Sequence, residues 1–390
     1  MTVTHNSNEI ILGRKEIDDV DAILAVPLVD PNEVLHVLKN NADTIFTWDY
    51  NNDRQQLHKL YEKAKVGQWN GTTDLPWETE VDVEAVIAAD QAALGTGLDM
   101  SQYTNSPLAK WGDKEWLQFG IEGRNWMLSQ FLHGEQGALI CTAKIVETVP
   151  WIDAKYYAAT QVMDEARHVE VFARYLDTKL DGHYPINTHL RLLLDDIIAD
   201  SRWDMTYLGM QIMVEGLALA AFGMAMQTTP DPLLKQLLRY VMSDEARHVA
   251  FGVLSLQEYY AGLTDAELLE RQEFAYEAAV RMRDRFLQQE VWDRMGVDVR
   301  KAVKLFDVPA EVKNQDPFQQ LLFSKIVPNC KKLGLLDAND GWLRKRFDVL
   351  GVTQFEDWAD TGEEYLEMDA VTQDRLAAAE ADGASGSSAA

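Results

Sequence analysis

The six-residue sequence DEARHV stands at residues 164–169 and recurs unchanged 80 residues later, at residues 244–249. The same offset relates a second glutamate, 30 residues before the glutamate of each motif, and a proline midway between the two: Glu135, Pro150 and Glu165, then Glu215, Pro230 and Glu245. This internal repeat predicts two helical hairpins of one design, each turning at its proline. Because the two arms of each hairpin are equally long, its two glutamates should lie side by side.

The spacing within each motif predicts a metal site. Glutamate and histidine three residues apart share one face of a helix, so both side chains can hold the same ion. One glutamate from each of two helices and a Glu-x-x-His from each of two others are the ligand set of four-helix di-iron and di-manganese proteins. The predicted ligands are Glu135, Glu165, His168, Glu215, Glu245 and His248.

The donor set also indicates which metal it suits. Four carboxylates balance the charge of two divalent ions, and mixed oxygen and nitrogen donors favour iron or manganese. Without cations, four buried carboxylates would repel one another strongly. We therefore expect two iron ions, with a manganese and an iron as the alternative.

The remaining charged residues of the motif have a supporting role in this prediction. Asp164 and Asp244 are placed to accept a hydrogen bond from the far ring nitrogen of a ligand histidine, which would fix its tautomer. Arg167 and Arg247 would then neutralise the two aspartates. The alternative is an ordinary ion pair on the protein surface.

Composition excludes several classes of function. A net charge of -27 disfavours nucleic acid and anionic membrane surfaces as partners, because both require a basic patch. The two cysteines form no CxxC pair, so neither a disulfide framework nor a thiolate metal site is indicated. The chain has neither a continuous apolar run of membrane-spanning length nor the residue order of a signal peptide. We expect a cytoplasmic protein that binds neither nucleic acid nor membrane.

Apolar residues at three- and four-residue spacing predict an all-α fold. The expected long helices are 114–147, 151–180, 187–227, 232–261 and 265–294, with shorter helical stretches at 32–47 and 53–66. Proline and glycine residues interrupt the helical pattern. We expect an N-terminal arm (1–110), a di-metal bundle (111–300), a C-terminal helical extension (301–380) and a tail (381–390). The tail is too poor in apolar residues to fold, so we expect it to be disordered.

Residues 115–260, with their doubled Glu and Asp-Glu-x-Arg-His pattern, resemble the ferritin-like superfamily of oxygen-activating di-iron carboxylate proteins. The motif is similar to those of bacterial multicomponent monooxygenases and acyl carrier protein desaturases, and the chain length is similar to that of arylamine N-oxygenases. Residues 60–70 with Trp77 resemble the entry segment of ribonucleotide reductase small subunits and ligand-binding oxidases. The resemblance implies a ferritin-like four-helix bundle with extra N- and C-terminal helices.

The chain departs from each branch of the superfamily at one position. Phe172 stands where reductase small subunits place their radical tyrosine, and Ala138 where ligand-binding oxidases crosslink a valine. Leu219 replaces a threonine that is usual in monooxygenases, and Val241 replaces a third histidine of the arylamine N-oxygenases. The branch therefore stays open at this point.

The resemblance implies an oxygenase that uses dioxygen to hydroxylate or N-oxygenate a small organic substrate. The alternatives are a desaturase and a radical or oxidase protein similar to the reductase small subunit; iron storage fits less well, because storage proteins are usually shorter chains. The sequence has no GxGxxG or Walker loop, so electrons are expected from a separate reductase or ferredoxin. Bundles of this kind often form a homodimer.

Overall fold

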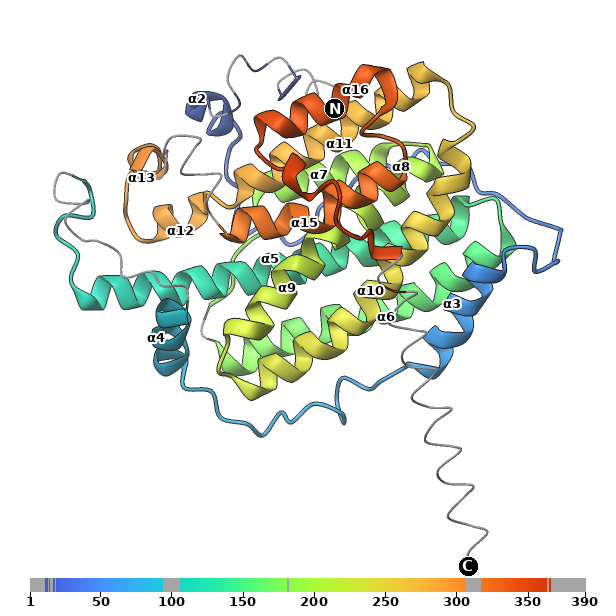
Figure 1. The fold of residues 1–390 in the computed structure, drawn as a ribbon. Coiled ribbons are helices and arrows are strands. Elements are labelled where there is room, and N and C mark those ends of the chain that lie inside the picture. Colours follow the sequence, from blue (N-terminus) through green and yellow to red (C-terminus); the bar gives the residue numbers. More distant parts are fainter. Residues whose placement is uncertain are drawn as a thin grey trace, which may run out of the picture.

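Helices make up nearly all the regular structure in the computed structural model, which describes residues 11–93 (without 13, 15, 16 and 18), 106–180, 182–305, 317–362 and 365. Within these ranges there is no β-strand, so the all-α prediction is confirmed. The helices, seen in Figure 1, are α2 (Val20–Ile23), α3 (Gln55–Val66), α4 (Val83–Ala93), α5 (Asp113–Thr148), α6 (Ile152–Lys179), α7 (Thr188–Ala199), α8 (Trp203–Tyr207), η2 (Leu208–Val214), α9 (Glu215–Thr228), α10 (Pro232–Tyr260), α11 (Asp265–Arg285), α12 (Gln289–Arg294), α13 (Val299–Leu305), α15 (Pro317–Lys332), α16 (Ala338–Val349) and η3 (Thr353–Phe355).

Two hairpins, α5–α6 and α9–α10, form the four-helix bundle predicted from the repeat. The helices of each hairpin pack against each other, and α6 contacts α10, which joins the two (Figure 1). Pro150 ends α5 because the residue before a proline avoids the helical conformation, and Val149 is indeed extended. At the second turn Asp231 caps α10 by accepting the N–H of Leu233. The prediction that each hairpin turns at its proline is confirmed.

The third bundle helix contains a π-helical segment. α8, η2 and α9 run on from one another, and η2 is a seven-residue π-helix that ends directly before Glu215. π-helical turns change which way the following side chains face and are frequent at functional sites. The stretch Trp203–Thr228 is long and apolar enough to cross a membrane, but 83% of its most apolar window is buried inside the protein, as in a core helix.

Two of the predicted long helices are interrupted. The stretch 187–227 breaks between α7 and α8 because the buried amine of Lys144 binds the carbonyls of Ile197, Ile198 and Asp200, which satisfies the end of α7 without a further turn. The stretch 265–294 breaks at Gln288, whose φ of 51° is left-handed. Both predictions of a single continuous helix are wrong.

The N-terminal segment fulfils one of two predictions. The helix at 53–66 is confirmed as α3, which packs on α6 and α10. The helix at 32–47 is wrong, because this stretch lacks regular structure and Val34, Leu35 and Val37 are exposed. Short helices are marginal in water without a packed apolar face, and here no such face forms. The domain boundaries stay a prediction, and the tail 381–390 lies outside the described residues.

The close approach of η2 and α10 depends on Gly252. A Cβ atom at this position would lie 2.5 Å from the Cβ of Gln211 and 3.2 Å from the Cδ1 of Ile212, both in η2. We predict that Gly252→Ala lowers the free energy of unfolding by about 1–3 kcal/mol through overpacking. The control is Gly123→Ala in α5, where a Cβ meets only the Gln288 side chain at 3.8 Å. Urea denaturation of both variants checks this, and equal stabilities would contradict the role of Gly252.

Candidate metal centre

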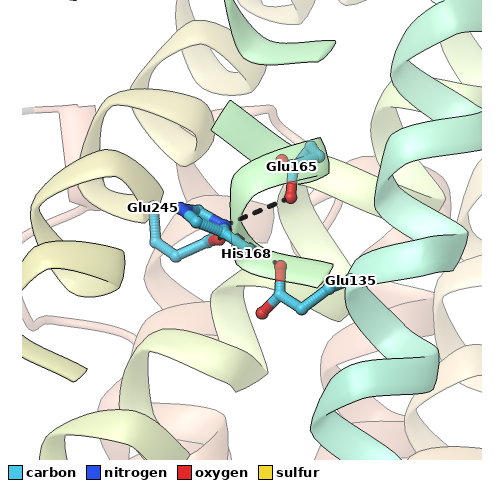
Figure 2. A group of neighbouring side chains, drawn as sticks. All are labelled: Glu135, Glu165, His168 and Glu245. Atoms are coloured by element: carbon cyan, nitrogen blue, oxygen red, sulfur yellow. Dashed lines mark hydrogen bonds and ion pairs between the residues drawn. The ribbon is translucent and has the colours of Figure 1, made fainter. Parts of the chain in front are cut away.

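The six predicted ligand residues lie together in the middle of the bundle. Glu135 comes from α5, Glu165 and His168 from α6, Glu215 from α9, and Glu245 and His248 from α10. Each is at most 5% exposed. Figure 2 shows four of them, Glu135, Glu165, His168 and Glu245, pointing toward one another.

The donor atoms form two overlapping groups. One atom from each of Glu135, Glu165, His168 and Glu245 lies within 4.8 Å of the others, and the same holds for Glu165, Glu215 and His248. Glu165 belongs to both groups. The two groups are therefore neighbours, as a pair of metal ions with a shared ligand requires.

The two motif glutamates each face both histidines. Glu165 places one carboxylate oxygen 3.4 Å from Nδ1 of His168 and the other 3.0 Å from Nδ1 of His248. Glu245 places one carboxylate oxygen 3.2 Å from Nδ1 of His168 and the other 3.6 Å from Nδ1 of His248. Glu135, by contrast, lies beside His168 alone, at 3.2 Å. Glu165 and Glu245 therefore each approach both histidines, whereas Glu135 approaches only His168.

Several donor atoms of this cluster are buried without a hydrogen-bond partner. They are Oε2 of Glu165, Oε2 of Glu215, both carboxylate oxygens of Glu245, and Nδ1 of His248. Nδ1 of His248 lies 3.0 Å from a carboxylate oxygen of Glu165 but does not form a hydrogen bond with it. An unsatisfied buried polar atom costs about 1–3 kcal/mol, so five in one place are unfavourable unless a ligand binds them. The donor set fits two cations.

Without a cation the cluster holds its charge balance with protons. Burial and repulsion from Glu245 raise the pKa of Glu135 and Glu215 well above the usual value. Burial alone would lower the pKa of His168 and His248, but the surrounding carboxylates raise it well above the usual value. Metal binding would displace these protons, because ligands coordinate in their deprotonated form.

The two aspartates of the motifs bind the histidines in a crossed arrangement. Asp244 accepts a hydrogen bond from Nε2 of His168 at 3.1 Å, while Asp164 lies 3.4 Å from Nε2 of His248. Each aspartate therefore contacts the histidine of the other hairpin. Arg167 donates to both aspartates, and Arg247 donates to Asp244 and lies 3.6 Å from Asp164. All four residues are buried, so the alternative of a surface ion pair does not apply.

The segment between α3 and α4 completes this network. Trp69 donates from its indole nitrogen to Asp244 at 2.8 Å, and its ring stacks on Tyr240. Gln68 donates to Asp164 at 2.9 Å and accepts from Arg167 at 2.8 Å. The sequence of this segment shows a resemblance to other proteins but gives no sign of a contact with the motifs. Its contact with the motif aspartates joins residues roughly a hundred or more positions apart, which no local pattern reveals.

Gln161 is a further site residue that sequence reasoning missed. Its amide donates to Glu165 at 3.0 Å and to Glu215 at 2.9 Å, and the side chain is fully buried. The available signal was its position one helical turn before Glu165. The repeat places Val241 at the equivalent position of the second motif, so the centre is not symmetric.

A narrow cavity of about 30 Å³ adjoins three of the glutamates, Glu135, Glu215 and Glu245. Phe131 and Phe222 line it. Phe131 and Phe222 belong to the same hydrophobic core cluster as Phe172, Met210 and Met213, which do not line the cavity. His133 is separate from the cluster and bonds to the carbonyl of Tyr184.

Comparisons with known proteins give a structural likeness only. No family model and no curated protein matches the chain. An R2-like ligand-binding oxidase with an aerobically reconstituted metal cofactor after photoconversion aligns with a TM-score of 0.47 and 16% identity, covering 72% of this chain and 94% of the other. A second such oxidase structure, with an aerobically reconstituted Mn/Fe cofactor, gives 0.45 and 16%, covering 76% and 93%.

Asp244 has hydrogen bonds to Trp69, Arg167, His168 and Arg247, so its replacement tests the network. Asp244→Asn leaves Arg167 and Arg247 with one carboxylate between them. We predict a loss of about 3–5 kcal/mol in the free energy of unfolding and about 10–100-fold weaker metal binding.

Trp69→Phe is the matched control for this variant. It keeps the carboxylate and removes one hydrogen bond and part of a buried ring, so it should cost less, about 1–3 kcal/mol, and leave ferrous-ion binding close to that of wild type. Chemical denaturation and ferrous-ion titration of both variants provide the comparison. Equal losses would show that Asp244 does not balance the two arginines.

Proposed function

We propose that this chain is a di-metal oxidoreductase, an oxygenase that uses dioxygen to hydroxylate or N-oxygenate a small organic substrate. The observation that supports this most directly is the set of buried, unpartnered donor atoms in two overlapping groups. Four of these five atoms lie 3.0–3.6 Å from an oppositely charged side chain, yet none of the five forms a hydrogen bond within the described part of the chain. A desaturase, which would use the same kind of centre, is the alternative.

In this proposal each metal ion has one histidine and one glutamate of its own. Glu135 and His168 would hold one ion, and Glu215 and His248 the other. Glu165 and Glu245 would bridge the two, since each directs one oxygen toward each histidine. Two iron ions fit the charge and the donor types, with a manganese and an iron as the alternative.

Two bound iron ions would supply the redox capacity for reducing dioxygen. The residues of the chain prepare the site for that chemistry. Gln161 orients Glu165 and Glu215 by donating to both. Asp244 and Asp164 hold the histidine rings in place. Phe131 and Phe222 supply apolar surface to the cavity lining beside the glutamates.

The proposal includes partners outside the chain. No nucleotide-binding motif is present in the sequence, so a separate ferredoxin or reductase would deliver electrons, and the acidic surface would suit a basic docking face on that partner. Dioxygen and the organic substrate would reach the centre through the cavity side. The homodimer and the cytoplasmic location stay predictions.

The bridging role of Glu165 predicts the metal content of variants. Wild-type protein loaded anaerobically with ferrous iron should bind about two ions per chain. Glu165→Ala removes a ligand from both ions and should retain less than about one, whereas Glu135→Ala should retain about one. Glu170→Ala, an exposed glutamate on the same helix, is the control and should bind as wild type. The measurement is the number of iron ions bound per chain in each variant. A wild-type chain that does not bind two ions would refute the proposal.

Rapid mixing with dioxygen tests the reaction. Ferrous-loaded wild-type protein should show a transient visible absorption band, recorded by stopped flow, that decays faster when an oxidisable substrate is present. Glu165→Ala should show no band, because its metal pair is incomplete. Direct accumulation of ferric absorption in the wild type, with no transient, would favour iron storage over oxygenase chemistry.

A further inference from the structure

Arg285 is a buried cation beside the candidate metal centre. It is the last residue of α11, its side chain is 6% exposed, and it lines the cavity together with Glu135, Glu215 and Glu245. Its Nε is buried without a hydrogen-bond partner. Burial lowers its pKa to about 10, so the guanidinium remains charged at neutral pH.

Several arginine side chains in the described residues that are buried as deeply as Arg285 form ion pairs, in contrast to Arg285. Arg271 binds Asp204, Arg14 binds Asp284, and Arg167 binds the motif aspartates. Arg285 has no ion pair in the described part of the chain, and its recorded contact is with the ring of Phe286, 4.9 Å away. The end of α11 offsets some of its charge through the helix dipole. A buried charge nevertheless requires hydrogen-bonding partners, and the residues that the structure describes provide none for this guanidinium group.

The charges of the metal centre do not require Arg285. Four glutamates balance two divalent ions, and two aspartates balance Arg167 and Arg247. Arg285 therefore adds one uncompensated positive charge at the cavity. An anion that enters from outside would supply the missing partner.

The cavity lining indicates where such an anion would bind. Gln130 also lines the cavity, but both ends of its amide are engaged, with the carbonyl of Pro185 and the N–H of Asn187. The guanidinium of Arg285 is thus the available donor. A carboxylate suits this position better than a phosphate, because its single charge matches that of Arg285 and a second negative charge would meet the three glutamates of the lining. A guanidinium binds a carboxylate through two parallel hydrogen bonds.

We propose that Arg285 binds the carboxylate of an organic acid substrate and directs its apolar part along Phe131 and Phe222 toward the metal centre. This inference rests on the proposed oxygenase function and specifies its substrate class. About 30 Å³ holds roughly two water molecules. The lining must therefore widen when the acid enters.

Calorimetric titration without dioxygen tests this binding. The probes are hexanoate and its uncharged counterpart hexan-1-ol, added to the metal-free and the ferrous-loaded chain. The variant is Arg285→Gln, and the control is Arg239→Gln, which removes the same charge from an exposed position of α10.

We expect hexanoate to bind wild type and Arg239→Gln more tightly than hexan-1-ol does. Arg285→Gln should weaken hexanoate binding by about tenfold or more. Equal hexanoate affinity in Arg285→Gln would overturn the inference, and so would equal binding of the alcohol or no binding of hexanoate to wild type.

A thermal unfolding measurement separates binding from structure. Because Arg285 is unpaired in the ligand-free chain, Arg285→Gln should raise the midpoint temperature, whereas replacement of a structural arginine lowers it. A lowered midpoint together with unchanged hexanoate affinity would make Arg285 structural. The metal-free titration separates a failure of the acid-binding inference from a failure of the proposed oxygenase function. Hexanoate binding in that titration does not depend on metal loading.

Discussion

Four glutamate side chains meet in the apolar interior of one helix bundle, and much of the surrounding structure serves to make this arrangement stable. Carboxylates in a dry interior repel one another and lose their hydration. The chain places two histidines among them and leaves donor atoms unpaired. Two divalent cations match both the charge and the geometry of this cluster.

The crossed network of aspartates and arginines links the two hairpins behind the histidines. Because Asp164 contacts His248 and Asp244 contacts His168, neither hairpin can slide along the other without breaking buried hydrogen bonds. Trp69 extends this network into the N-terminal segment. The same interactions that hold the ligands in position therefore also fix the relative register of the bundle helices.

The centre has two different sides, although the motifs are identical. Behind the histidines lies the network of charged residues, and beside Glu135, Glu215 and Glu245 lies the cavity with Arg285. Gln161 has no counterpart at Val241, and the π-helix η2 precedes only one of the paired glutamates. In the proposed function, this asymmetry would give a substrate one face of approach and leave the other face for orienting the ligands.

The sequence by itself determined the helical class, the two hairpins, their proline turns and the candidate ligand set, because all of these follow from short-range spacing and an exact repeat. The sequence pattern predicted wrongly that one helix runs through the break between α7 and α8 and that 32–47 is helical. Helix formation at these places depends on the distant amine of Lys144 or on a packing surface that does not form. Only the tertiary structure decided the crossed aspartates, the contacts of Trp69 and the unpaired state of Arg285. Each of these joins, or fails to join, groups far apart in the chain, and local periodicity carries no information about such distances.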